Sequence, residues 1–133
     1  MPLDADAVRR WFDGYFETFS ACARGDRDMS ELLRHYGVPL ILATDDGVTT
    51  LMTDDEAAAV MQSLADGLRA NGFHRTEVLH SEVSVLNGTS AIYRGSMSRR
   101  NSEGKEIGSP TITYLVTDDV AGLRIVVLAT QGQ

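Results

Sequence analysis

The second half of the chain constrains the fold most, because from residue 75 onward it has the pattern of three consecutive hairpins of long strands. The strand-like segments, which alternate with turn residues, cover residues 76–86, 89–100, 107–117 and 123–130. Asn87-Gly88, between the first two segments, is a strong signal for a two-residue hairpin turn. Because these strands exceed the usual length of about five to six residues, we expect bulges and strong bending, with bend points at Gly95 and residues 108–110.

The predicted turn also determines which side chains share a face of the sheet. With residues 87–88 as the turn, Val83 pairs with Ile92 and Ser81 pairs with Arg94. We expect this side to face the helices, so Arg94 is expected to point inward. An inward arginine without a carboxylate partner is costly, and it should therefore reach the mouth of a cavity or meet an anionic ligand.

Both faces of the predicted sheet are partly apolar. In the last strand the apolar side chains are Leu123, Ile125, Val127 and Ala129 on one side, and Val126 and Leu128 on the other. A sheet with helices on one side only usually alternates apolar and polar residues. We therefore expect a homodimer through the free sheet face, with isologous twofold geometry.

The first half of the chain has helical periodicity. One apolar stripe recurs at steps of three and four residues and consists of Val8, Phe12, Tyr15, Phe19 and Cys22. Asp4 or Asp6 caps the start of this helix, and residues 25–26 (Gly-Asp) end it. Asp28 then opens a short second helix that continues through Leu33.

A short hairpin and a third helix complete the predicted elements. Residues 40–43 and 48–52 read as strands around a turn at 45–47. A capping box over residues 53–56 begins the helix, and Asn71-Gly72 ends it. Its apolar stripe consists of Ala57, Val60, Met61, Leu64 and Leu68. The sequence thus predicts an α+β fold, with N-terminal helices packed in the concave face of a strongly bent, mixed, mostly antiparallel sheet.

Composition limits the classes of function. At 133 residues, with 43% hydrophobic residues, the chain suits one globular domain over residues 1–133. The net charge of −7 argues against nucleic-acid and anionic-membrane partners. The basic pair Arg99-Arg100 reads as a solvated edge. One cysteine fits a reducing compartment, and neither a signal sequence nor an apolar run of membrane length is found, so we expect a cytoplasmic protein.

The order of the elements points to a known architecture. The segments that carry it are residues 25–26, the helix over 53–72, Thr-Tyr-Leu-Val at 113–116 and Gly-Leu-Arg-Ile at 122–125. Over essentially its whole length the chain resembles the nuclear-transport-factor-like superfamily, also called SnoaL-like or cystatin-like. The resemblance implies that the sheet curls around the first helix as a cone-shaped barrel, whose open mouth holds a small ligand or an active site. Because one fold hosts many functions, the resemblance does not specify a reaction.

Catalysis of the ketosteroid isomerase type is not expected, although that superfamily includes such enzymes. Such an enzyme needs an acid in the oxyanion hole and a carboxylate base. In this sequence the corresponding positions hold Ile112 and either Leu42 or Ala43, which cannot perform these roles. His35 and Tyr15 remain candidate proton carriers for a cofactor-free cyclase, isomerase or dehydratase. The three histidines lack acid or cysteine neighbours at ligand spacing, so neither a metal nor a cofactor is expected.

The expected cavity combines residues from the helices and the sheet. Its predicted ligand-binding residues are Trp11, Tyr15, Phe19, His35, Tyr36, Met61, Arg94, Ile112 and Tyr114. The leading hypothesis is a small-molecule-binding protein with an apolar cavity, anchored by Tyr15, Arg94 and Tyr114. The alternatives are a cofactor-free enzyme on the same scaffold and a non-catalytic dimeric interaction module with a filled cavity. A small apolar ligand and a second copy of the chain are the expected partners.

Overall fold

The structure of the chain is a computed structural model that describes residues 3–132. Three helices occupy the first half, and most of the strands occupy the second. In chain order the elements are α1 (Ala5–Arg24), α2 (Met29–Leu33), β1 (Tyr36–Thr44), β2 (Gly47–Leu51), α3 (Asp54–Ala70), β3 (Phe73–Asn87), β4 (Ser90–Asn101), β5 (Glu106–Gly108), β6 (Thr111–Asp119) and β7 (Gly122–Gln131).

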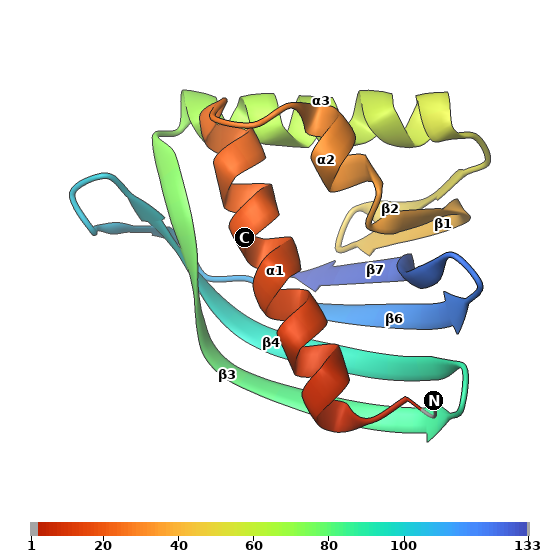
Figure 1. Cartoon of the computed structure of the whole chain (residues 1–133). Coiled ribbons are helices and arrows are strands. Elements are labelled where there is room, and N and C mark those ends of the chain that lie inside the picture. Colours follow the sequence, from red (N-terminus) through yellow and green to blue (C-terminus); the bar gives the residue numbers. More distant parts are fainter. Residues whose placement is uncertain (1–2, 133) are drawn as a thin grey trace.

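The strands form one mixed sheet that bends around α1. Its order is β2-β1-β7-β6-β4-β3, with β5 paired to β4, and it stays open because β2 and β3 do not meet. The pairing of β1 with β7 is parallel, and all the other pairings are antiparallel. Figure 1 shows α1 crossing the curved sheet diagonally, with α3 lying along its upper end. The predicted α+β class and bent, mostly antiparallel sheet are confirmed.

Residues at the helix ends explain where the helices start and stop. The Ala7 backbone N–H donates to Asp4 Oδ1 (2.8 Å) at the start of α1, and Gly25, with φ 86°, ends that helix in the left-handed region. At the start of α3 the Glu56 N–H donates to Thr53 Oγ1 (3.1 Å). The predicted caps of these helices are therefore correct.

The aromatic stripe of α1 fills the concave face of the sheet. Phe12 stacks on Tyr93 of β4 with ring centroids 4.2 Å apart, and it also lies 4.9 Å from the Tyr114 ring of β6. Phe19 meets Phe73 edge to face at 6.2 Å. Fully burying one such side chain contributes about 1.5–3 kcal/mol, so these rings fix how α1 sits in the sheet.

The hairpin register differs by one residue from the sequence prediction. Asn87 pairs with Ser90 and Val85 pairs with Ala91, which leaves Leu86 as an extra residue in β3. The turn forms one position later than predicted, because Asn87 Oδ1 accepts hydrogen bonds from the Thr89 N–H (2.9 Å) and the Ser90 hydroxyl (2.8 Å).

This bulge reverses the faces expected for β4. A shift of one residue moves every side chain of a strand to its other face. The inner face of β4 consists of Ala91, Tyr93, Gly95, Met97 and Arg99, whereas Ile92, Arg94 and Ser96 lie on the outer face. The inward orientation predicted for Arg94 is therefore wrong.

The strand predicted over residues 107–117 is divided in two. Residues 109–110 separate β5 from β6, at the bend point expected from the Ser-Pro sequence. β5 pairs with β4 through Arg99 and Arg100, whereas β6 pairs with β4 through residues 90–96. The interruption lets β4 keep partners along both halves of its length.

We predict that Gly25→Ala lowers the free energy of unfolding by about 1–2 kcal/mol, because alanine is strained at φ 86°. A Cβ at this position would also lie 3.1 Å from Arg69 Nη2. The control is Gly14→Ala, in the exposed interior of α1, where an added Cβ meets nothing within 4 Å and stability should rise by up to about 1 kcal/mol. Urea unfolding measures both changes. Equal changes of the same sign would contradict the conformational role of Gly25.

Candidate functional site

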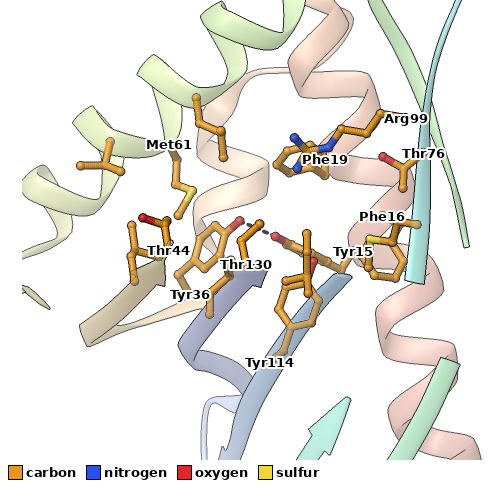
Figure 2. Close-up of a pocket in the computed structure, with 16 residues that line it drawn as sticks. Tyr15, Phe16, Phe19, Tyr36, Thr44, Met61, Thr76, Arg99, Tyr114 and Thr130 are labelled. Atoms are coloured by element: carbon orange, nitrogen blue, oxygen red, sulfur yellow. Dashed lines mark hydrogen bonds between the residues drawn. The ribbon is translucent and has the colours of Figure 1, made fainter. Parts of the chain in front are cut away.

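A pocket of about 250 Å³ lies between α1, α3 and the inner face of the sheet (Figure 2). Most of its walls are aromatic or aliphatic side chains. The lining residues are Tyr15, Phe16, Phe19, Tyr36, Leu42, Thr44, Val60, Met61, Leu64, Thr76, Met97, Arg99, Ile112, Tyr114, Leu128 and Thr130. Two of the lining residues are exposed to solvent, Leu64 of α3 (39%) and Thr44 at the end of β1, so both lie at the edge of the pocket.

Three tyrosines supply hydroxyl groups to the pocket. Tyr15 of α1 and Tyr36 of β1 join their hydroxyls in a hydrogen bond of 2.5 Å, in which either oxygen can be the donor. The Tyr114 ring packs against Tyr15 with centroids 5.8 Å apart and an interplanar angle of 78°. Figure 2 shows the Tyr15 and Tyr36 hydroxyls meeting inside the pocket.

Burial controls the ionisation of these tyrosines. Loss of solvent raises the pKa of Tyr15, Tyr36 and Tyr114, and in Tyr15 and Tyr114 the electrostatic effect of a neighbouring tyrosine raises it further. At neutral pH these groups are therefore uncharged phenols that donate hydrogen bonds. They are poorly suited to accept a proton as a general base.

Arg99 is the only positively charged residue among those that line the pocket. Its side chain extends from β4 into the pocket, and its backbone pairs with Thr76 of β3, another lining residue (Figure 2). Burial lowers the pKa of Arg99, while the nearby Tyr114 and Tyr15 raise it. Across residues 3–132 no carboxylate acts on its pKa, and Arg99 takes part in none of the ion pairs.

The structure brings together most of the residues predicted for the site. The six that line the pocket are Tyr15, Phe19, Tyr36, Met61, Ile112 and Tyr114. Trp11 and His35 lie one layer farther out: both rings pack against Tyr15, at 6.0 and 5.5 Å, and they do not line the cavity. His35 Nδ1 lies 3.1 Å from the Leu32 carbonyl oxygen, so the imidazole interacts with the C-terminal end of α2. Arg94 is exposed on the outer face, opposite Glu82.

Sequence reasoning missed Arg99, which the structure places in the position expected for Arg94. The pair Arg99-Arg100 read as a solvated edge, yet Arg99 is partly buried in the pocket, and Arg100 lies within 3.6 Å of Glu77. No sequence signal would have identified Arg99, because alternation places it on the same face of β4 as Met97 but does not show which face is buried. Thr44, Thr76 and Thr130 were also missed, because threonine is common in strands without any ligand.

Residues 3–132 contain no group of three or more His, Cys, Asp or Glu side chains arranged to hold a metal ion. None of its helices combines the length and apolarity needed to cross a membrane.

Comparison with known families identifies the architecture. A model of an NTF2-like protein family, DUF6841, matches residues 5–133. The chain belongs to this NTF2-like family. A search of curated proteins finds no match. The family assignment agrees with the resemblance inferred from the order of helices and strands.

Solved structures share the fold at low sequence identity. A protein of unknown function with a cystatin-like fold from Nostoc punctiforme is 14% identical, covers 100% of this chain and 96% of its own, and has a TM-score of 0.74. An NTF2-like protein of unknown function from Shewanella oneidensis is 18% identical over 97% and 99% of the two chains, with a TM-score of 0.72. A putative calcium/calmodulin-dependent protein kinase II association domain from Xanthomonas campestris is 11% identical over 98% and 89%, with a TM-score of 0.71. At these identities the comparisons show the fold alone.

We predict that none of the four tyrosines titrates normally in the folded protein, because burial raises the pKa of Tyr15, Tyr36, Tyr93 and Tyr114 alike. Their contribution to stability is complete below the unfolded pKa of about 10 and is lost as the pH rises above it, because the unfolded state releases the phenolic protons first. Absorbance at 295 nm measures phenolate. Little should form at pH 10 in the native protein, whereas the chain in urea should be about half ionised. A native transition centred at pH 10 would contradict the buried placement.

Proposed function

We propose that this protein binds a small, mostly apolar molecule in the pocket between α1, α3 and the sheet. The observation that carries the proposal is a cavity of about 250 Å³ with apolar walls and a few converging polar groups. Such a combination is typical of small-molecule sites, in which apolar surface supplies affinity and placed polar groups fix orientation. A non-catalytic module with a filled cavity fits this geometry less well.

The lining residues favour binding over acid–base catalysis. Among the residues that line the described pocket there is no His, Asp, Glu, Lys or Cys. The tyrosines stay protonated at neutral pH, because burial raises the pKa of each. His35, the candidate proton carrier, lies behind the Tyr15 ring. A cyclase, isomerase or dehydratase would need a proton acceptor supplied by the substrate or by water.

We also propose that a second copy of the chain covers the outer face of the sheet. Four strands that are neighbours in the sheet, β4, β6, β7 and β1, present a row of apolar side chains there. The row consists of Ile92, Leu115, Val127 and Ile41. Arg94 and Glu82 flank this row as a pair of opposite charges on the same face. A twofold contact can align such a self-complementary surface with itself.

We also propose that the protein is located in the cytoplasm. The buried free thiol of Cys22 supports a reducing compartment and hence a cytoplasmic protein. Fractionation of the native host tests this proposal, and recovery outside the cytoplasm would contradict it.

Indole tests the binding proposal, because it is neutral, largely apolar and about the size of the cavity. We expect wild-type protein to bind indole, with NMR shift changes concentrated at the lining residues. Leu64→Trp should weaken binding by about tenfold or more, because a larger side chain at the pocket edge occupies the entrance. Leu79→Trp is the matched control: Leu79 is 62% exposed on β3, lies outside the pocket and should leave binding unchanged. No binding, or equal effects of the two variants, would contradict the proposal.

For the dimer, we predict that sedimentation equilibrium gives twice the monomer mass at micromolar concentration. Leu115→Glu should shift the protein to monomer, because a buried unpaired charge at the centre of the contact is costly. Glu103→Gln, at an exposed position between β4 and β5, should leave the dimer intact. A wild-type monomer at micromolar concentration would contradict the proposed interface.

A further inference from the structure

The pocket contains a cation without a counter-charge. Arg99 reaches into a cavity whose other walls are apolar side chains, tyrosines and threonines (Figure 2). No carboxylate pairs with it in residues 3–132. A charge placed in apolar surroundings is costly unless it is paired, so this position needs an explanation beyond packing.

Two other arginines, Arg24 and Arg69, do have partners within the fold. Arg69 Nε donates to the Ala23 carbonyl oxygen at 3.0 Å, and Arg24 Nη1 donates to the His74 carbonyl oxygen at 2.7 Å. Each of these contacts ties a helix end to a neighbouring element. Arg99 makes no comparable structural contact in the described part of the chain, which separates it from arginines that serve the fold.

The three tyrosines of the pocket also keep one unused donor. Their hydroxyls carry three hydrogens, of which the Tyr15–Tyr36 hydrogen bond uses one and the hydrogen bond between the Tyr15 and Tyr114 side chains uses a second. One phenolic hydrogen is left over within this group of three. The polar side of the pocket therefore offers a guanidinium and a phenolic O–H, which together match a hydrogen-bond acceptor that carries negative charge.

We propose that the ligand is a small monocarboxylate whose carboxylate pairs with Arg99 and whose apolar body lies against the aromatic walls of the pocket. This inference rests on the proposed function and specifies its ligand class. One guanidinium balances one negative charge, whereas a phosphate ester, with a charge of about −1.5 to −2, would remain undercompensated. The remaining hydroxyl hydrogen of the Tyr15, Tyr36 and Tyr114 group donates to the second carboxylate oxygen and orients it.

The size of the cavity limits the apolar body. A volume of about 250 Å³ corresponds to roughly eight molecules of liquid water at about 30 Å³ each. A single substituted aromatic ring or a short branched chain has this bulk. The rings of Phe19 and Tyr114 offer faces and edges on which an aromatic ligand can pack.

Benzoate and benzamide test the inference, because they share size and shape and differ in charge. We expect wild-type protein to bind benzoate at least about tenfold more tightly than benzamide in calorimetric titrations. Phenyl phosphate should bind more weakly than benzoate. Arg99→Met keeps the bulk of the side chain but removes its charge, so it should abolish the preference for benzoate and leave benzamide binding intact. Arg94→Met, on the outer face of the same strand, is the matched control and should preserve the preference.

A stability measurement separates this role from a structural one. Because Arg99 is uncompensated in the empty pocket, Arg99→Met should raise the melting temperature of the ligand-free protein, while benzoate should stabilise the wild type and not the variant. Equal affinity for benzoate and benzamide, tighter binding of phenyl phosphate, or a preference that survives Arg99→Met would overturn the inference. If indole still binds in that case, the proposed function stands; if neither indole nor benzoate binds, both fail.

Discussion

The packing of α1 against the concave face of the sheet is the interaction on which the rest of the structure depends. Phe12, Phe16 and Phe19 and their neighbours on α1 join the strands into one core. A sheet that bends this strongly exposes apolar surface on its inner side unless a helix covers it. α1 covers one part of that surface, and the space left beneath α3 becomes the pocket.

The pocket therefore exists because α1 fills only part of the space on the concave side of the sheet. Side chains near it are held by packing: Trp11 and His35 support the Tyr15 ring from outside, and Tyr36 meets its hydroxyl from β1. This arrangement orients the tyrosine hydroxyls before any ligand arrives. Preorganised donors cost little additional entropy on binding. Under the proposal made above, the partly buried charge of Arg99 lowers stability in the empty pocket and is compensated when a carboxylate binds.

Much of the fold could be predicted from local sequence signals. The caps at Asp4 and Thr53 and the left-handed Gly25 are determined by groups within a few residues, so the helix ends were predictable. The aromatic residues of α1 were recognisable from their helical spacing. The bent, mostly antiparallel sheet followed from the length and number of the strands.

The contents of the pocket were less predictable, because they depend on register. The bulge at Leu86 shifts the pairing of β3 and β4 by one residue, and this single shift exchanges Arg94 for Arg99 on the inner face. The Asn87 side chain sets the shift through its bonds to Thr89 and Ser90, and the sequence Asn-Gly alone does not distinguish the two turn positions. Alternation could not decide the inner face either, since both sides of the sheet carry apolar residues.

A crystal structure of the protein with benzoate would show whether Arg99 binds a carboxylate in the pocket. We expect benzoate in the pocket, with its carboxylate oxygens within about 3.2 Å of the Arg99 guanidinium nitrogens and its ring against the aromatic walls. A benzoate bound with its carboxylate turned toward solvent, or an Arg99 side chain paired instead with a carboxylate of the protein, would contradict this expectation.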